Sequence, residues 1–219
     1  MALINDEYKL KLKEEFGKIL KDDVQILLFK DTDSQCAYCN DTEKLITELN
    51  EIDGRIKPDI HTINEDLAKT FGITKGPVLI MKSKHFQKGN IRYYGIPSGY
   101  EFRSIVEDIK ALSTGNIELR EGTIEKLKKI EKPINIKVFI TPTCPYCPAA
   151  VGMAHKFAMV NENITGDMIE SYEFNEMAEE AAVSSVPHTT ITDLDQPIIG
   201  AQPEEIFLDQ VLLSAEISS

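Results

Sequence analysis

The sequence predicts an α/β protein of two tandem units, each with a mixed central sheet flanked by helices. The first observation is a Cys-x-x-Cys motif that occurs twice and holds all four cysteines, as Cys36-Ala37-Tyr38-Cys39 and as Cys144-Pro145-Tyr146-Cys147. The second is that the pattern around the motif recurs in the same order at an offset of 108 to 110 residues. A repeat of that length is far longer than a solenoid period, so it indicates two domains.

Length, charge and composition narrow the class of protein. A chain of 219 residues with 42% apolar residues is long enough for two cores of ordinary size. The net charge of −12 argues against nucleic acid as a partner, because binding it needs a basic face. No apolar run approaches the roughly 18 residues of a membrane span, and the N-terminus lacks the order of a secretory signal. We therefore expect a cytoplasmic protein without a membrane partner.

The first elements of each unit surround the cysteine motif. Apolar positions three and four residues apart predict a one-sided helix over 12–20 and another over 124–130. The β-branched and apolar runs Val24–Phe29 and Ile134–Phe139 then predict strands, at an offset of 110. Each motif follows its strand and opens an amphipathic segment, which places the dithiol at the start of a helix.

The second half of each unit also repeats. The matching segments are Ile63–Glu65 with Phe174–Glu176, Gly76-Pro77 with Val186-Pro187, and Gly95–Phe102 with Gly200–Phe207. They predict a short helix, a strand that begins after the proline, and a hairpin strand that ends in glycine before a last helix. A βαβ half and a hairpin half together give a mixed sheet. We place the boundary in the turn-rich stretch 113–116, which gives units 1–114 and 115–219.

A dithiol at the start of a helix favours thiol–disulfide chemistry. The helix N-terminus carries partial positive charge and free N–H groups. These stabilise a thiolate and can lower a cysteine pKa from about 8.5 to roughly 3.5–7.5. Two intervening residues also bring the second sulfur within bonding reach of the first. The sequence therefore indicates a protein with two redox-active dithiols.

The order strand, Cys-x-x-Cys, helix and a later proline resembles the thioredoxin fold. Pro77 lies 38 residues after Cys39, and Pro187 lies 40 residues after Cys147. The second motif, Cys-Pro-Tyr-Cys, is also that of the glutaredoxins. A full-length pair of such units, each with its own dithiol, resembles the two-domain, glutaredoxin-like protein disulfide oxidoreductases of thermophilic archaea and bacteria. The resemblance implies reduction, formation or isomerisation of protein disulfides.

The resemblance also implies a role for each cysteine. Cys36 and Cys144 are the expected nucleophiles, with exposed sulfurs at the helix start. Cys39 and Cys147 are expected to be more buried and to resolve the mixed disulfide. The sequence has no Gly-rich phosphate loop or dinucleotide fingerprint, so we expect no bound cofactor besides the dithiols. The implied partners are disulfide-containing proteins as substrates and a flavin-dependent thioredoxin reductase as reductant.

The prolines are expected to shape the substrate site of each unit. In the thioredoxin fold the matching residue forms a cis peptide bond beside the dithiol, and the resemblance implies this for Pro77 and Pro187. The backbone of the preceding residue, Gly76 or Val186, is expected to pair with a substrate strand. Because Gly76 carries no side chain, we expect it to hold substrates less firmly than Val186.

Residues inside the two motifs are expected to tune the sites. Pro145 fits a first helical turn, where its missing N–H costs nothing, and removes a donor that would otherwise solvate a sulfur. Ala37 lacks that effect, so we expect the two dithiols to differ in redox potential. Tyr38 and Tyr146 are interpreted either as a docking surface or as partly packed aromatic residues.

The chain departs from the thioredoxin pattern at two points. It has no Trp, so the usual Trp-Cys-Gly-Pro-Cys is absent. The buried acid that thioredoxins carry on the strand before the dithiol aligns near Leu28 and Val138, which are both apolar. A proton acceptor for the buried cysteine must then come from elsewhere in the chain or from water.

Three alternatives stay open at this point. Two Cys-x-x-Cys motifs can supply a Cys₄ zinc or iron–sulfur site, although zinc pairs are usually about 15–20 residues apart and here 104 residues lie between Cys39 and Cys144. The cysteines can also form inert structural disulfides. Within redox chemistry, the alternative is an electron shuttle, which resembles the twin-thioredoxin module of bacterial peroxide-reducing systems.

Overall fold

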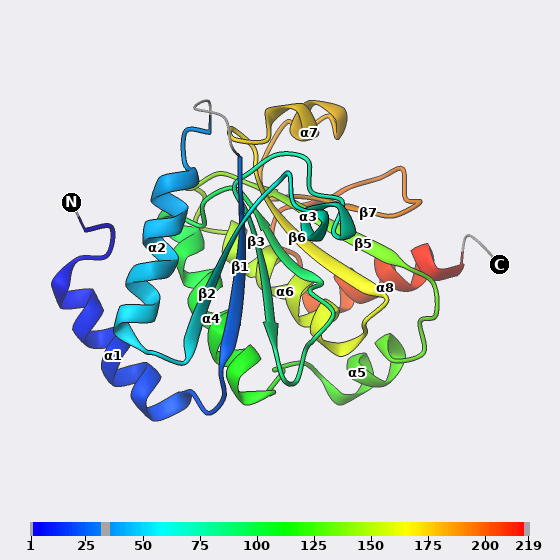
Figure 1. Ribbon diagram of the computed structural model, residues 1–219. Helices are drawn as coiled ribbons and strands as arrows, with labels where there is room; N and C mark the ends of the chain where they lie inside the picture. The colour runs from blue at the N-terminus through cyan, green and yellow to red at the C-terminus, as the bar shows by residue number, and fades with distance from the viewer. Residues whose placement is uncertain (1, 32–35, 217–219) are drawn as a thin grey trace. The chain divides into compact units, whose positions relative to one another are not determined.

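The structure, a computed structural model, describes residues 2–31 and 36–216 (Figure 1). It divides into two compact units. Unit 1 consists of Met1–Gly89, Tyr94–Ile96 and Ile109–Asn116, and unit 2 of Asn90–Tyr93, Pro97–Asp108 and Ile117–Ser219. Strand β4 (Ile91–Tyr94) and helix α4 (Phe102–Thr114) contribute residues to both units. The boundary between residues 114 and 115 remains a prediction.

Unit 1 is built around strand β1 (Val24–Lys30). It pairs in parallel with β2 (Ile56–Thr62) and antiparallel with β3 (Val78–Ser83), so the sheet is mixed. The helices that lie wholly in this unit are α1 (Asp6–Ile19), α2 (Cys39–Ile52) and the short α3 (Asp66–Thr70). The predicted strand after the first helix, and the helix that opens at the cysteine motif, are confirmed.

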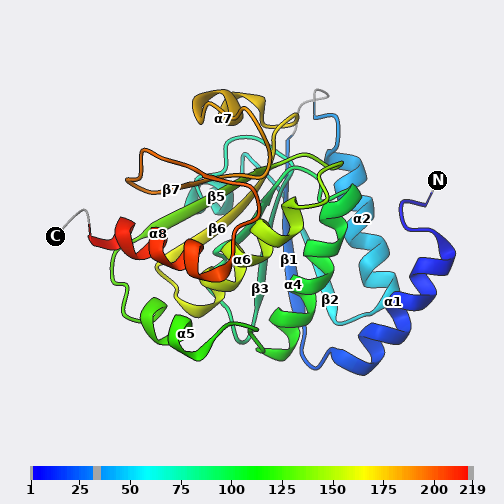
Figure 2. The ribbon, with the colours of Figure 1, turned by 180° about the vertical axis from the view of Figure 1, so that it is seen from behind.

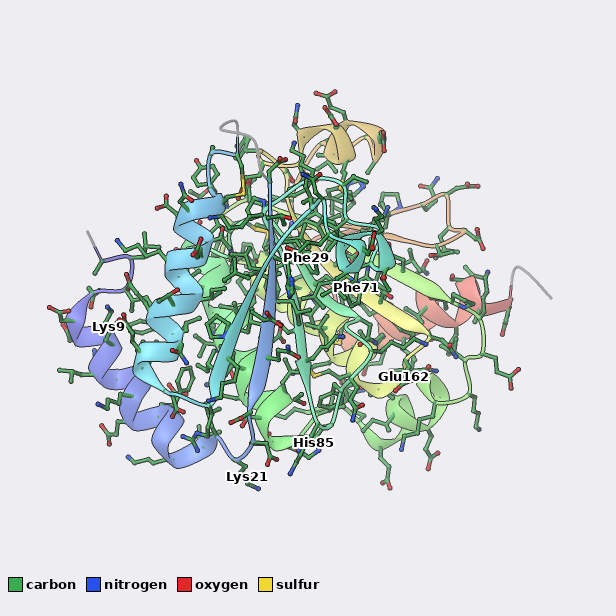
Figure 3. The ribbon with its side chains drawn as sticks, in the orientation of Figure 1. Lys9, Lys21, Phe29, Phe71, His85 and Glu162 are labelled. Atoms are coloured by element: carbon green, nitrogen blue, oxygen red, sulfur yellow. A yellow bond between two sulfur atoms is a disulfide. The ribbon has the colours of Figure 1, made fainter. Side chains whose placement is uncertain are left out.

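Strand β1 forms because its sequence is almost continuously apolar, which is typical of a strand covered on both faces. Its fully buried residues are Val24, Ile26, Leu28 and Phe29. The ring of Phe29 packs against Phe71, the residue that ends α3, with ring centroids 6.0 Å apart (Figure 3). Helix α2 buries Leu45, Ile46 and Leu49. These contacts fix the end of β1, from which the chain enters the first dithiol.

Unit 2 repeats this arrangement around strand β5 (Ile134–Ile140). It pairs in parallel with β6 (Ile164–Glu170) and antiparallel with β7 (His188–Ile191), which pairs with β8 (Ile198–Ile199). The remaining elements are the 3₁₀ turn η1 (Gly99–Glu101), α5 (Glu121–Leu127), α6 (Cys147–Val160), α7 (Asn175–Glu180) and α8 (Glu204–Glu216). Figure 2 shows α6 and α8 in front of β5 and β6, and Figure 1 shows them behind these strands. The predicted α/β class is confirmed.

Backbone hydrogen bonds reveal the same fold in both units. In unit 1 the Gly95 N–H donates to the Pro77 carbonyl at 2.9 Å. In unit 2 the Gly200 N–H donates to the Pro187 carbonyl at the same distance of 2.9 Å. The repeated motifs in the sequence therefore reflect a repeated backbone. None of the helices in the described ranges is long and apolar enough to cross a membrane.

Candidate active site

The first dithiol lies at the start of α2. Cys39 is the first residue of the helix, Cys36 lies in the turn before it, and the two sulfurs form a disulfide. Cys39 is buried, whereas Cys36 is half-buried. The N–H of Asp31, the residue after β1, donates to Cys39 Sγ at 3.3 Å. The helix start predicted for this pair is therefore confirmed.

The loop that precedes β3 lies next to Cys36 of the first dithiol. The Gly76–Pro77 peptide bond is cis, as the resemblance implies. The carbonyl oxygen of Gly76 lies 3.5 Å from Cys36 Sγ. A Cβ atom on Gly76 would lie 2.6 Å from the Asp31 nitrogen and 2.7 Å from the Phe29 carbonyl oxygen. The glycine is therefore required by the close approach of two backbone segments.

The second dithiol lies at the start of α6. Cys147 is the first residue of the helix and forms a disulfide with Cys144. The Cys147 N–H donates to Cys144 Sγ at 3.2 Å. A donor aimed at this sulfur stabilises negative charge on it, as expected for a nucleophilic cysteine at a helix start. The helix start predicted for this pair is confirmed as well.

Two expectations about the second motif are wrong. Cys144 is not exposed: only 7% of its surface is accessible, while Cys147 is fully buried. Pro145 does not lie in the first helical turn, since α6 begins two residues later and its first turn contains Pro148. Pro145 instead lies in the exposed turn between the two cysteines.

The loop before β7 in unit 2 differs from the loop before β3 in unit 1 at the residue before the proline. The Val186–Pro187 peptide bond is cis, and Val186 is half-buried. His188 follows on β7, where its ring packs edge-on against Phe139 with centroids 6.0 Å apart. Burial lowers the pKa of His188. Unit 2 thus accommodates a β-branched side chain where unit 1 requires glycine.

The tyrosine of each motif projects into solvent. Tyr38 is 45% exposed and Tyr146 is 69% exposed. Tyr38 is the more covered of the two rings, and both interpretations, a docking surface or partly packed rings, remain predictions. Their exposure leaves both rings accessible beside the dithiols.

A buried carboxyl group in unit 2 was not identified from the sequence. Leu28 and Val138 are fully buried apolar residues, so neither strand supplies an acid. Glu101 in η1 is fully buried, and burial raises its pKa to about 7, against a hydrogen bond from the Ser104 hydroxyl at 2.6 Å. Its Oε1 has no hydrogen-bond partner among the described residues. Such a group can exchange a proton near neutral pH.

Glu101 lies beside the chain segment that leads into the second dithiol. The adjacent Tyr100 N–H donates to the carbonyl of Pro142 at 3.0 Å, and Pro142 lies two residues before Cys144. Turn η1 also contacts α6, the helix that Cys147 begins. No signal in the sequence marks this residue, because an acid in an amphipathic segment usually faces solvent.

A dithiol at the start of a helix, in each of two α/β units with thioredoxin-like topology, is the arrangement of a thiol–disulfide oxidoreductase. A protein disulfide oxidoreductase from Aeropyrum pernix is 31% identical, with a TM-score of 0.85 over 97% of this chain and 94% of that chain. The chain belongs to the family of two-domain protein disulfide oxidoreductases. Residues 134–213 also match the family described as thioredoxin domain.

A second group of similar proteins comes from peroxide-reducing systems. The alkyl hydroperoxide reductase AhpF of Staphylococcus epidermidis is 27% identical over 177 residues, which are 81% of this chain and 32% of the relative. The chain thus spans about a third of the length of that relative. A domain of AhpF from Enterococcus faecalis has a TM-score of 0.84 at 23% identity, over 95% of this chain and 99% of that one. At this identity the likeness concerns the fold.

Proposed function

We propose that the protein exchanges disulfides at both dithiols, with Cys36 and Cys144 as nucleophiles and Cys39 and Cys147 as resolving residues. The observation that carries the assignment is the Cys147 N–H, which donates to Cys144 Sγ at 3.2 Å. Cys147 itself is fully buried and Cys39 is 3% exposed, so a substrate disulfide reaches neither directly. The first cysteine of each pair is the better placed one for attack.

Reduction of a substrate proceeds in two exchange steps. The Cys144 thiolate attacks one sulfur of the substrate disulfide, forms a mixed disulfide and releases the other sulfur as a thiolate, which takes up a proton. The Cys147 thiolate then attacks Cys144 Sγ and releases the second substrate sulfur. Two electrons have passed to the substrate, and the protein holds the disulfide. The reverse sequence forms a disulfide in the substrate, and Cys144 alone can isomerise one.

We infer that Glu101 accepts the proton of the Cys147 thiol in the second step. Its pKa of about 7 matches this task, and its neighbour Tyr100 is hydrogen-bonded to the segment before Cys144. The backbones of Gly76 and Val186 are proposed to hold the substrate strand. The close contact of Gly76 with Cys36 Sγ supports this for the first site.

The partners are proposed by chemical class. Protein disulfides are the substrates, and a flavin-dependent thioredoxin reductase is the proposed source of the two electrons that restore each dithiol. The cytoplasm is the proposed location, because paired cysteines are more often catalytic than structural in a reducing compartment. The dithiols themselves are the redox groups, and each forms a disulfide within its own motif.

A second candidate function is electron transfer to a peroxide-reducing system. The similarity to the alkyl hydroperoxide reductase AhpF favours it, although the chain spans only 32% of that relative. A shuttle would be oxidised by one dedicated acceptor much faster than by protein disulfides in general. Comparing the oxidation rate of the reduced protein by insulin and by a bacterial peroxidase of this system separates the two functions.

Trapping of mixed disulfides tests the assignment of the cysteines. In Cys147→Ser, a substrate disulfide is expected to remain attached to Cys144, and in Cys39→Ser to Cys36, each detected as a mass increase. In Cys144→Ser and Cys36→Ser, no adduct is expected at the altered site. Adducts on Cys147 or Cys39 in these last two variants would contradict the assigned order.

A further inference from the structure

Three strongly exposed tyrosines belong to unit 2. Their exposed fractions are 54% for Tyr100, 69% for Tyr146 and 77% for Tyr172. They come from three separate segments, namely η1, the second cysteine motif and the turn after β6. Large exposed aromatic rings are enriched at sites where proteins bind partners. We name these three residues the tyrosine rim.

Each tyrosine lies in, or next to, a chain segment that is joined to the loop that carries Cys144. Tyr146 is part of the motif itself. The Tyr100 N–H donates to the carbonyl of Pro142 at 3.0 Å. The N–H of Ser171, the residue before Tyr172, donates to the carbonyl of Ile140, the last residue of β5, at 3.0 Å. The segments that carry the tyrosine rim are therefore part of, or directly bonded to, residues 140–146, along which a substrate must approach the second dithiol.

Helix α7 continues directly from the turn that holds Tyr172. The carboxylate of Glu170, which is buried, accepts the N–H of Tyr172 at 3.1 Å and that of Glu173 at 2.7 Å, so this turn has a fixed shape. Figures 1 and 2 show α7 set apart from the helices α6 and α8. The helix therefore continues the chain of the tyrosine rim beyond Tyr172.

This continuation is negatively charged. Glu176, Glu179 and Glu180 on α7 are exposed, and none has an ion-pair partner among the residues that the structure describes. The sequence contains no Lys or Arg after Lys156, so no cation from the last 63 residues offsets them. The exposed Arg103 lies three residues after Tyr100, near the start of α4, whereas α7 itself carries no Lys or Arg.

We propose that the second dithiol selects disulfides whose cysteine is flanked by Lys or Arg. This inference rests on the proposed function and names its substrate class. A Lys or Arg side chain suits both parts of the surface, because it can stack on a tyrosine face and pair with the carboxylates of α7. An acidic segment suits neither part, and for the same reason a second copy of this chain, with a net charge of −12, is a poor occupant.

Two matched peptides test the proposal with the second dithiol alone. The full chain with Cys36→Ser and Cys39→Ser is reduced and mixed with a peptide joined to thionitrobenzoate through a disulfide. Oxidation of the dithiol releases the coloured thiolate and the peptide thiol, so two electrons are counted. The peptides differ only in two residues beside the cysteine, Lys-Lys or Glu-Glu. Each rate is divided by the rate of the same peptide with dithiothreitol, which removes differences in intrinsic reactivity.

The expected result is a rate at least about tenfold higher for the Lys peptide at low ionic strength, since attraction between opposite charges raises association rates by 10- to 1,000-fold. The difference is expected to shrink in about 0.5 M salt, where screening is strong. Equal rates, or a faster Glu peptide, would overturn the proposal and point to a neutral or anionic partner. A salt-independent preference would overturn it as well.

Variants locate the preference on the surface. The triple change Glu176→Gln, Glu179→Gln and Glu180→Gln is expected to remove most of the preference, and Tyr172→Ala part of it. A matched control removes three exposed charges elsewhere in unit 2, by Glu162→Gln, Asp195→Asn and Glu216→Gln; Figure 3 shows Glu162 at the end of the unit away from α7. An equal loss in the control would show that net charge alone acts, and would overturn the proposal.

A small neutral disulfide separates this proposal from the function on which it rests. The chain with Cys36→Ser and Cys39→Ser, and the same chain with the three control changes, are expected to reduce dithiodipyridine at one common rate. If the dithiol reduces it but the two peptides react equally, the substrate class is wrong and the oxidoreductase function stands. If the second dithiol reduces no disulfide at all, the proposed function of this site fails.

Discussion

His155 Nδ1 lies 2.6 Å from Asp108 Oδ2, and both side chains are buried inside unit 2. The hydroxyl of Tyr93 donates to the same carboxylate oxygen. Burial lowers the pKa of His155, but the charge and the hydrogen bond of Asp108 outweigh it, so the net shift is upward. The helix that begins at Cys147 is therefore tied to α4 by a buried ion pair.

Replacing Asp108 with Asn is expected to lower the free energy of unfolding by about 3 kcal/mol, because it leaves a buried histidine without its charged partner. Urea denaturation followed by circular dichroism measures this. Asp209→Asn, at an exposed position on α8, serves as the control and is expected to change stability by less than about 0.5 kcal/mol. Equal midpoints for the two variants would argue against a stabilising role of the pair.

Glu101 is expected to make the stability of the protein depend on pH. Burial raises its pKa from 4.5 to about 7, so the folded protein holds a proton that the unfolded chain releases above pH 4.5. Stability from this group is present below pH 4.5, falls as the pH rises from 4.5 to 7, and is then level, with a total change of about 3 kcal/mol.

Denaturation curves of the wild type and of Glu101→Gln at pH 5 and pH 8 check this expectation. The variant carries no titrating group at this position, so its stability relative to the wild type is expected to rise between the two pH values. If the difference in unfolding free energy between the variant and the wild type were the same at pH 5 and pH 8, Glu101 would not titrate in this range. Asp209→Asn serves as the control in this experiment too, because Glu107 on the following helix α4 makes interactions of its own.

Gly76→Val is expected to damage the first site. The added Cβ would lie 2.6 Å from the Asp31 nitrogen and 2.7 Å from the Phe29 carbonyl oxygen, and both are backbone atoms that cannot rotate away. We expect a loss of about 2–3 kcal/mol of stability, as for other overpacked sites, and slower oxidation of the first dithiol. The reciprocal change Val186→Gly at the second site is expected to cost less than about 1.5 kcal/mol. Comparable effects of the two changes would contradict the steric explanation.

The histidine beside the first site is expected to titrate above its ordinary range. His61 stacks on Phe29, its Nδ1 lies 2.7 Å from Glu65 Oε2, and its Nε2 lies 3.1 Å from Asp59 Oδ1. Burial lowers the pKa of His61. The two carboxylates raise this pKa by more than burial lowers it, so the net shift is upward from 6.5. The stability that the charged ring contributes is full below pH 6.5 and is lost as the pH rises through the folded-state pKa.

An NMR titration of the His61 ring measures this shift directly. Glu65→Gln is expected to bring the pKa down towards 6.5, because it removes one of the two charges while keeping the size of the side chain. A His61 pKa below 6.5 in the unaltered protein would contradict the upward shift.

The elements that carry the dithiols could be predicted from local sequence. The run Val24–Phe29 is apolar at nearly every position, and a strand of that kind needs cover on both faces, which fixes an α/β architecture. The cysteine pairs mark the following helix starts because their chemistry depends on a helix N-terminus. Gly95 and Gly200 were recognisable as hairpin ends because they recur in equal settings, and their N–H groups make equivalent hydrogen bonds.

Long-range packing explains what the sequence left undetermined. Glu101 looks like a surface residue in its own segment, but it is fully buried where η1 contacts α6. The burial of Cys144 depends on the conformation of the turn 141–146, which follows no periodic pattern. Pro145 was placed in the helix because a proline suits a first turn, but Pro148 meets that preference instead.

The absence of a Cβ atom at position 76 makes the two halves of the chain unequal despite their common fold. The backbones of Phe29 and Asp31 approach so closely there that no other side chain fits without moving the end of β1. Val186 occupies the matching position in the other half. A chimera that transplants 186–191 into the first half would therefore import an obstruction, whereas the reverse transplant would only leave a gap. Only the segment from the first half can replace its counterpart without a steric clash.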